Sequence, residues 1–375
     1  MSGTMRQLVS TLSSEGKLEL AIAAVDRPEP ADDEVLIRVE ASPINPSDLG
    51  AMFGPADMST AQAAGSPDNP MVIATVPANL MQAAAARVGK PVTLGIEGAG
   101  IVEKAGTTAA AQALTGKTVA VMGGAMYAEY RIAKADQCLV MPDGTTPVEA
   151  ASCFVNPLTV LGMVETMRME GHTALVHTAA ASNLGQMLGK LCSNEGIELV
   201  NIVRRHEHVD LLKSLGAGYV YDSSRDSFMD ELIEALMATN ATLAFDAIGG
   251  GTLAGQIIAA METAQARSGG AVGPYGSTTH KQVYIYGGLD RSPTQIDRAF
   301  GLAWGIGGWL MPSFMAKIGL EAGQKLREKV AAEITSTFAS VYSNQVSLSE
   351  VLGLDSIAAF GRKATGEKYL ICPQK

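Results

Sequence analysis

Residues 174–186 have the sequence ALVHTAAASNLGQ, in which an apolar run gives way to small residues and then to helix formers. This pattern predicts a buried strand that turns tightly into a helix. Aligned to the dinucleotide-binding pattern G-x-G-x-x-G, the glycine positions fall on Ala180, Ser182 and Gly185. Small residues there let the backbone approach a pyrophosphate at the helix N-terminus, and Ser182 and Asn183 can add hydrogen bonds. The alternative is an ordinary turn of small residues.

The surrounding chain repeats the same order of strand and helix. We expect strands at 174–178, 198–203, 219–221, 242–246 and 283–286, and helices at 156–170, 184–193, 209–215, 228–238 and 253–266. Such alternation predicts right-handed βαβ units and a parallel sheet covered by helices on both faces. Residues 155–312 are therefore expected to form an α/β domain of the doubly wound, Rossmann type.

The flanking regions have a different pattern. EVLIRVE (34–40) alternates apolar and charged residues as a half-buried strand does, and GIEGAGIV (95–102) places three glycines in a strand-like run, which indicates a tightly bent sheet. Further short strands are expected at 117–122, 129–133 and 368–372. We expect residues 313–375 to join residues 1–154 in one β-rich domain.

The composition limits the class of protein. Of 375 residues, 47% are hydrophobic and 18% charged, which excludes a disordered chain. The net charge of −10 argues against nucleic-acid binding, because such proteins present clustered Lys and Arg. The N-terminus has no apolar signal segment, and the longest nearly apolar run, 300–311, is too short to span a membrane. The cysteines are far apart with no CxxC pair, as in a reduced cytoplasmic protein; they are Cys138, Cys153, Cys192 and Cys372.

The second expected strand ends in Val203-Arg204-Arg205. About twenty residues after the turn, NAD-binding proteins place a carboxylate that accepts from the ribose 2′-hydroxyl, whereas Arg suits the 2′-phosphate of NADP. Because the guanidinium fork matches phosphate geometry, the two arginines favour NADPH as the cofactor. The alternative is a solvated surface pair.

Six short motifs follow one another along the chain: ASPINPSD (41–48), VNPLT (155–159), LKSLGA (212–217), FDAIGG (245–250), YGG (286–288) and GWL (308–310). Together they resemble the zinc-free branch of the medium-chain dehydrogenase/reductase superfamily, in particular quinone oxidoreductases and trans-2-enoyl thioester reductases. The resemblance implies a GroES-like β-rich catalytic domain in addition to the Rossmann cofactor domain.

The same resemblance implies which residues contact the cofactor. They lie in the VNPxT motif, in the turn after the first parallel strand, at the end of the second strand, in the YGG and GWL motifs and near the C-terminus. Carried over one at a time, they are Asn156, Thr159, Ser182, Asn183, Leu184, Arg204 with its neighbour Arg205, Tyr286, Gly287, Trp309, Leu310 and Lys368. Lys368 is expected to pair with a phosphate, and the alternative is an exposed lysine near the chain end.

Two departures from the family pattern bear on the chemistry. Zinc-dependent members have a Cys where this chain has Asn45, and Gly-His-Glu where it has Gly95-Ile96-Glu97, so no metal site is expected. Related enoyl reductases carry a Tyr proposed to protonate the substrate, but the matching stretch MFGPAD (52–57) has none. An insertion at 54–93 is expected to reshape the substrate pocket.

The candidate catalytic residues are Asn45, which could polarise a substrate carbonyl, and Tyr127 of the motif GAMYAEY. The respective alternatives are a turn residue that satisfies its own backbone and a packed core tyrosine. His177 is expected to be a satisfied buried histidine. The polar stretch 268–281, which contains His280, could contact substrate or a neighbouring subunit. Protonation by water is a further alternative.

These observations predict an NADPH-dependent reductase that transfers hydride to an activated C=C bond, of an enone or enoyl thioester, or to a quinone. The alternatives are a zinc-free alcohol or aldehyde oxidoreductase and a non-catalytic NADPH-binding sensor. The expected partners are a small-molecule substrate and, from the resemblance, a second copy of the chain. Residues 282–286 and 300–311 could form that dimer interface, unless 300–311 is domain core.

Overall fold

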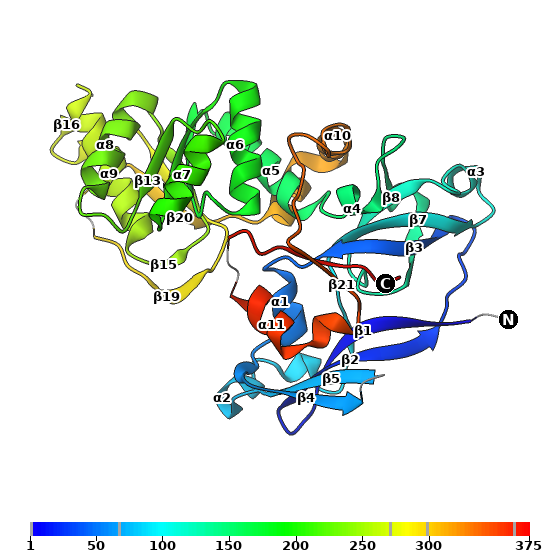
Figure 1. The fold of residues 1–375 in the computed structure, drawn as a ribbon. Coiled ribbons are helices and arrows are strands. Elements are labelled where there is room, and N and C mark those ends of the chain that lie inside the picture. Colours follow the sequence, from blue (N-terminus) through cyan, green and yellow to red (C-terminus); the bar gives the residue numbers. More distant parts are fainter. Residues whose placement is uncertain (1–2, 67–68, 270–271, 298–299, 363–364) are drawn as a thin grey trace. The chain divides into compact units, whose positions relative to one another are not determined.

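The computed structural model describes residues 3–66, 69–269, 272–297, 300–362 and 365–375. The chain divides into two compact units, Met1–Val155 with Arg327–Lys375 (unit 1) and Asn156–Leu326 (unit 2), and each has its own sheets and buried core (Figure 1). The chain returns to unit 1 within helix α10 (Met311–Ala332), which continues unit 2 past the boundary expected at 313.

Unit 1 holds two sheets, with strand orders β4-β5-β2-β1-β6 and β10-β8-β7-β3-β22-β21; β9 also pairs with β3. The strands are β1 (Thr4–Leu12), β2 (Lys17–Asp26), β3 (Glu34–Pro43), β4 (Asp57–Ser66), β5 (Asn69–Thr75), β6 (Val92–Thr93), β7 (Glu97–Ala105), β8 (Thr118–Met122), β9 (Tyr130–Lys134), β10 (Leu139–Val140), β21 (Asn344–Val346) and β22 (Tyr369–Ile371). The helices are α1 (Asp48–Phe53), α2 (Ala78–Met81), α3 (Ala109–Gln112), α4 (Pro147–Ala150) and α11 (Leu354–Gly361), with short 3₁₀ turns at Ala85–Arg87, Ala135–Gln137 and Glu350–Leu352. Because β22 pairs antiparallel with β3, the C-terminal tail completes a sheet of the N-terminal part.

The glycines of β7 are required by the close approach of β3. A Cβ at Gly100 would lie 2.1 Å from the carbonyl oxygen of Arg38, and one at Gly98 would lie 2.8 Å from that of Ala41. The pairing of the two strands shifts register between Val39 and Ala41. The strands therefore bend against each other where the glycine run predicts a bent sheet.

The insertion at 54–93 forms mainly a hairpin. Strands β4 and β5 pair antiparallel with each other, and β5 pairs with β2, so the insertion widens the first sheet of unit 1. Residues 67–68 between the two strands lie outside the described residues.

Unit 2 is a six-stranded parallel sheet in the order β13-β12-β11-β14-β18-β20. Its main elements are α5 (Val155–Met169), β11 (Ala174–Thr178), α6 (Asn183–Glu195), β12 (Glu198–Val203), α7 (His206–Ser214), β13 (Tyr219–Asp222), α8 (Phe228–Thr239), β14 (Leu243–Asp246), α9 (Leu253–Arg267), β18 (Lys281–Ile285) and β20 (Trp304–Gly308). Two small ribbons pair β15 (Gly249–Gly251) with β19 (Asp290–Thr294) and β16 (Val272–Gly273) with β17 (Gly276–Ser277). The alternation of strand and helix thus produces the Rossmann-type fold that it predicts.

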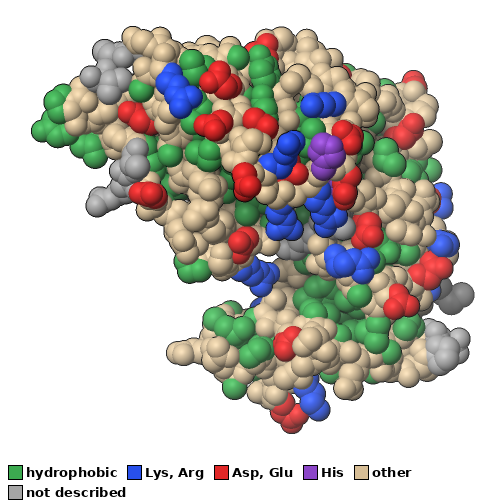
Figure 2. Space-filling view, turned by 60° about the vertical axis from the view of Figure 1, so that its left-hand side comes forward, with side chains coloured by type: hydrophobic (Ala, Val, Ile, Leu, Met, Phe, Trp, Pro, Cys, Tyr) green, Lys and Arg blue, Asp and Glu red, His purple; other side chains and the backbone are tan. Residues whose placement is uncertain are grey.

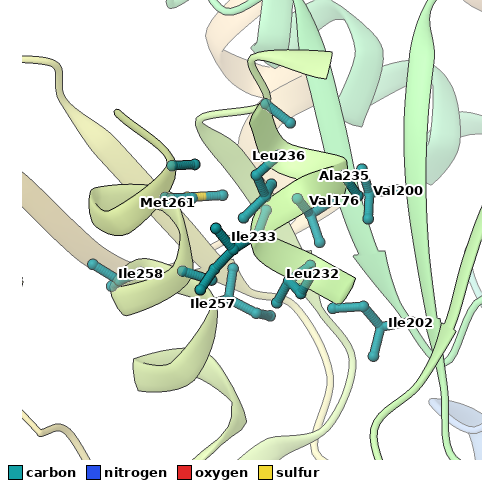
Figure 3. Packing of buried hydrophobic residues seen from close by; sticks show 14 of the residues in the cluster. Val176, Val200, Ile202, Leu232, Ile233, Ala235, Leu236, Ile257, Ile258 and Met261 are labelled. Carbon is teal, nitrogen blue, oxygen red and sulfur yellow. The ribbon is translucent and has the colours of Figure 1, made fainter. Parts of the chain in front are cut away.

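The core of unit 2 lies between the sheet and helices α8 and α9 (Figure 3). Apolar side chains from the strands meet apolar side chains from both helices, and the labelled ones are Val176, Val200, Ile202, Leu232, Ile233, Ala235, Leu236, Ile257, Ile258 and Met261. Burial of each large apolar side chain contributes about 1.5–3 kcal/mol, so this layer holds the sheet in place.

The stretch 268–281 is anchored at the amino end of β18. Lys281 is fully buried, and its Nζ donates to Glu262 Oε2 of α9 (2.5 Å) and to the carbonyl oxygen of Thr279 (2.9 Å). Glu262 Oε1 also accepts the backbone N–H of Ser277 (2.7 Å). This end of the strand is opposite the edge that carries the predicted cofactor turn. Residues 270–271 lie outside the described part.

The surface carries mixed charge. Basic and acidic side chains are interspersed on the face drawn in Figure 2. Among exposed ion pairs, Arg168 contacts both Glu165 (2.6 Å) and Glu195 (2.7 Å). All four cysteines are free thiols. Within the described ranges, none of the helices has the length and apolar character needed to cross a membrane.

Candidate cofactor and active site

The turn after β11 leads directly into helix α6, as the sequence pattern predicts. Ser182 is the N-cap of α6, and its Oγ accepts the backbone N–H of Gly185 (3.1 Å). A Cβ on Gly185 would lie 2.1 Å from the carbonyl oxygen of Ala180, so the helix approaches the turn closely because this residue is glycine. Ala179 has a left-handed φ of 51°, a strained conformation for a residue with a side chain. Gly185 therefore has the packing role that the sequence pattern predicts for it.

The turn lies at the point where the strand order reverses, between β11 and β14. In open α/β sheets, ligands bind outside the carboxyl ends of the strands at such a point. Here Thr178 Oγ1 donates to Asp246 Oδ1 (2.7 Å) and accepts the N–H of Ala247 (2.8 Å). Asp246 also accepts the N–H groups of Ile248 (2.9 Å) and Gly249 (3.1 Å). Asp246 thus ties the two central strands together, a role that sequence reasoning missed although the residue lies in the FDAIGG motif.

Arg204 and Arg205 follow β12, the strand next to β11, and both side chains are exposed. Arg205 Nη1 lies 3.3 Å from Glu207 Oε1. Hydrogen bonds from Ser292 and, more weakly, the charge of Arg204 lower the pKa of Asp290 on β19. Both guanidinium groups therefore lie in solvent at the carboxyl edge of the sheet, where a phosphate could reach them.

Tyr286 and Gly287 follow β18 at the same edge. The hydroxyl of Tyr286 lies 2.7 Å from Nε2 of His177, and the two rings stack. His177 is fully buried, and its Nδ1 has no hydrogen-bond partner among the described residues. Desolvation lowers the pKa of His177 to about 3, so the imidazole is neutral. The predicted buried histidine is thus satisfied at one nitrogen.

Two further groups of predicted cofactor residues lie around α5. Asn156 and Thr159 are buried in its first turns. Trp309 follows β20, and its indole Nε1 donates to Thr166 Oγ1 of α5 (3.1 Å). Leu310, the next residue, is 60% exposed. The indole of Trp309 is thus fixed to α5, whereas the side chain of Leu310 is free to contact a ligand.

In unit 1, Asn45 and Glu97 belong to a buried polar network. The side-chain amide of Asn45 donates to Glu97 Oε1 (2.8 Å), and Glu97 Oε2 accepts the backbone N–H groups of Phe154 (2.7 Å) and Val155 (3.0 Å). The backbone N–H of Asn45 donates to Asp48 Oδ2 (2.8 Å). Asn45 therefore holds Glu97 in addition to having a satisfied backbone. Among the described residues, no three His, Cys, Asp or Glu side chains are grouped so that they could hold a metal ion.

Lys368 extends this network. Its Nζ donates to Ser152 Oγ (2.8 Å), and the hydroxyl of Tyr342 donates to the same oxygen (2.9 Å). Desolvation lowers the pKa of Lys368 to about 8, although the carboxylates of Glu97 and Asp48 oppose the change. Desolvation likewise raises the pKa of Asp48 to about 7 and raises that of Glu97. Lys368 is half-buried, so it is not the exposed lysine near the chain end that was the alternative to a phosphate contact.

Tyr127 is fully buried in unit 1, and its hydroxyl donates to the carbonyl oxygen of Pro43 (3.0 Å). Gly95 makes room for it, since a Cβ there would lie 2.6 Å from the Tyr127 ring. Desolvation, together with the charge of Asp48, raises the pKa of Tyr127 well above its usual value. These contacts are those of a packed core tyrosine, which was the alternative to a catalytic role for Tyr127.

Several known proteins are similar to this chain in sequence and in fold. Residues 31–143 match the family model of the alcohol dehydrogenase GroES-like domain. The chain is 26% identical over 240 residues to the mitochondrial enoyl-[acyl-carrier-protein] reductase of Caenorhabditis elegans, in an alignment that covers 62% of this chain and 60% of that protein. Residues 31–143 thus form a GroES-like domain of the alcohol dehydrogenase type.

The chain is also 29% identical over 164 residues to the synaptic vesicle membrane protein VAT-1 homolog of Rattus norvegicus, in an alignment that covers 43% of this chain and 40% of that protein. It therefore spans 60% or less of the length of these curated relatives. The crystal structure of a putative NADPH:quinone reductase from Mesorhizobium loti has a TM-score of 0.73 at 24% identity, covering 100% of this chain and 99% of that one. The expected combination of a GroES-like domain and a Rossmann domain is confirmed.

Proposed function

We propose that this chain is an NADPH-dependent reductase that transfers hydride to an activated C=C bond or to a quinone without a metal. The observation that carries the proposal is the turn after β11, where Gly185 packs on Ala180 at the reversal of strand order. The exposed pair Arg204 and Arg205 ends the next strand. When bound, NADPH supplies the hydride.

The cofactor contacts that we propose follow from this arrangement. The N-terminus of α6, with Ser182, Asn183 and Leu184, suits a pyrophosphate, because its N–H groups and helix dipole favour negative charge. Arg204 and Arg205 suit the 2′-phosphate. Further proposed contacts are Asn156, Thr159, Tyr286, Gly287, Trp309 and Leu310.

Asn45 is our candidate for polarising the substrate carbonyl. A side-chain amide has two hydrogens, and Asn45 gives one of them to Glu97, which leaves one for a substrate oxygen. Tyr127 has a single hydroxyl hydrogen and gives it to Pro43. The geometry therefore favours Asn45 over Tyr127. Glu97 accepts three N–H groups, an arrangement that suits a hydrogen-bonded carboxylate rather than a zinc ligand.

We rank α,β-unsaturated carbonyl compounds first among substrates and quinones second. One curated relative is named as an enoyl-[acyl-carrier-protein] reductase, and one structural neighbour as a putative NADPH:quinone reductase. Both reactions deliver hydride to a carbon or oxygen activated by a conjugated carbonyl group, so one site can polarise either substrate.

We also propose a homodimer formed through β20. This strand pairs with β18 and is the last strand in the order of the parallel sheet, so one edge is available for pairing. Leu302, which precedes it, is 71% exposed, whereas Phe300 is fully buried. The segment 300–311 thus contains both core and surface residues.

Stopped-flow oxidation of NADPH with an enone, a crotonyl-type thioester and a quinone tests the proposed function. We expect turnover with NADPH on at least one unsaturated carbonyl compound and much weaker turnover with NADH. Tight NADPH binding without turnover on any substrate would contradict the proposal and favour a cofactor sensor.

A further inference from the structure

We propose that Lys368 is the proton donor of the reduction, in place of the tyrosine that this chain lacks. The inference rests on the proposed function and names the residue that completes its chemistry. It gives Lys368 a role different from the phosphate contact that the family resemblance implies.

The register of β22 against β3 places Lys368 close to Asn45. Leu370 pairs with Pro43 and Ile371 with Ser42, in antiparallel order. The N–H of Ile44 donates to the carbonyl oxygen of Tyr369 (3.0 Å), which continues the same register. Lys368 and Asn45 are the next residues of these two segments, just beyond the ends of β22 and β3. Both residues act on Glu97, Asn45 through a hydrogen bond and Lys368 through its charge.

The side chain of Lys368 is also held in position. Its Nζ donates to Ser152 Oγ (2.8 Å), and this oxygen is fixed in turn by the hydroxyl of Tyr342 (2.9 Å). The Nζ lies 5.6 Å from the centre of the Tyr342 ring. A lysine with a hydroxyl partner, an aromatic neighbour and partial burial loses the conformational freedom of a surface lysine, as a proton donor requires.

The charges around Lys368 favour a proton donor over a phosphate ligand. The groups that act on it are the carboxyls of Glu97 on β7 and Asp48 on α1, together with the phenol of Tyr342. A phosphate placed here would be repelled by the carboxylates of Glu97 and Asp48. Desolvation meanwhile brings the pKa of Lys368 to about 8, close to the range in which general acids work best.

The reduction adds a hydride and then a proton across the C=C bond. Hydride adds to the β-carbon of the unsaturated carbonyl compound, and its electron pair leaves an enolate. The N–H bond of the Lys368 ammonium then breaks as a C–H bond forms at the α-carbon, which leaves a neutral amine and the saturated carbonyl compound. The amine regains its proton from solvent, to which the half-buried side chain has access.

The variants Lys368→Met and Lys368→Arg test the proposal, with Lys375→Met as a matched control. Lys375 is an exposed lysine whose Nζ donates to Glu350 (2.9 Å), and its replacement should leave kcat unchanged. We expect both Lys368 variants to lose about 100-fold or more in kcat, the effect of removing a general acid. Arg should not rescue, because its guanidinium does not release a proton near neutral pH. Circular dichroism and thermal melting check that the variants fold.

Two measurements separate proton donation from cofactor binding. Fluorescence titration should give an NADPH Kd within about threefold of wild type for both variants, a difference of less than about 1 kcal/mol. Competitive acetylation of the wild-type protein, read by mass spectrometry, should give Lys368 a pKa of about 8. In wild type, kcat should fall above that pH because the donor loses its proton, and the residual rate of Lys368→Met should lack this decline.

Retention of kcat in Lys368→Met, or rescue by Arg, would overturn the proposal. A large rise in NADPH Kd with kcat retained at saturating cofactor would also overturn it and assign Lys368 to the phosphate. If the wild-type protein itself reduces none of the substrates, the proposed function fails and this inference fails with it. The wild-type assay therefore distinguishes the two failures.

Discussion

Replacement of Glu97 tests the buried polar network of unit 1, which holds the proposed catalytic residue Asn45. Its carboxylate is fully buried and accepts three N–H groups, from the side chain of Asn45 and from the backbone of Phe154 and Val155. Glu97→Ala removes the acceptor of all three. A buried donor without a partner costs about 1–3 kcal/mol, so we expect the variant to lose about 3 kcal/mol or more of stability.

Glu97→Gln should be much milder. Its amide oxygen can accept from Phe154 and Val155, while its Nε2 donates to Asn45 once the Asn45 amide turns over to present its oxygen. All three contacts keep a partner, and a desolvated charge is removed. We expect a change within about 1 kcal/mol, the size of a typical net hydrogen-bond contribution.

Glu103→Ala is the matched control on the same strand. Glu103 forms surface ion pairs with Arg27 and Arg38, which contribute about 0–1 kcal/mol. Urea unfolding followed by far-UV circular dichroism measures the three variants. Hydrogen exchange at Phe154 and Val155 should accelerate about a hundredfold in Glu97→Ala, because every 1.4 kcal/mol is about tenfold. A Glu97→Ala variant within about 1 kcal/mol of wild type, or Gln as costly as Ala, would refute the reasoning.

Two further predictions concern the cofactor. Gly185→Ala should lower the melting temperature and weaken NADPH binding in a fluorescence titration, since its Cβ would lie 2.1 Å from the Ala180 carbonyl oxygen; Gly189→Ala on the same helix, with open space around it, should be neutral or stabilising by up to about 1 kcal/mol. Equal behaviour of the two variants would contradict the packing argument. Arg204→Ala combined with Arg205→Ala should raise the KM for NADPH by roughly tenfold or more, the loss of one charged phosphate contact, and leave that for NADH nearly unchanged. Equal effects on both cofactors would exclude the 2′-phosphate assignment.

Local sequence patterns predicted most of unit 2 because its strands and helices are set by local periodicity. The parallel strands and their helices lie close to the expected ranges. Strand β20 was not expected, because WGIGG has few β-formers and becomes a strand by pairing with β18. Likewise β4, DMSTAQAAGS, has polar and small residues and depends on its pairing with β5. Such segments form strands because neighbouring strands pair with them, rather than because of their own β-propensity.

The candidate site likewise combines residues that the sequence could predict with residues that it could not. Gly185 and Ser182 could be recognised because the turn is contiguous in sequence. The network of unit 1 joins Asp48, Glu97 and Lys368, which are brought together through the pairing of β7 and β22 with β3. Sequence alone gave no distance between these residues, so their shared role as a buried charge cluster was missed. The one local signal was the carboxylate retained at Glu97 where the other zinc ligands are replaced.

Isotope transfer from the cofactor tests the central claim most directly. NADPH carrying deuterium at C4, on the face from which hydride leaves, is mixed with the protein and an enone, and the product is analysed by mass spectrometry and NMR. The account predicts a saturated ketone with deuterium at the β-carbon. NADPH oxidation that leaves no deuterium in the product, or no oxidation with any unsaturated carbonyl compound or quinone, would contradict it.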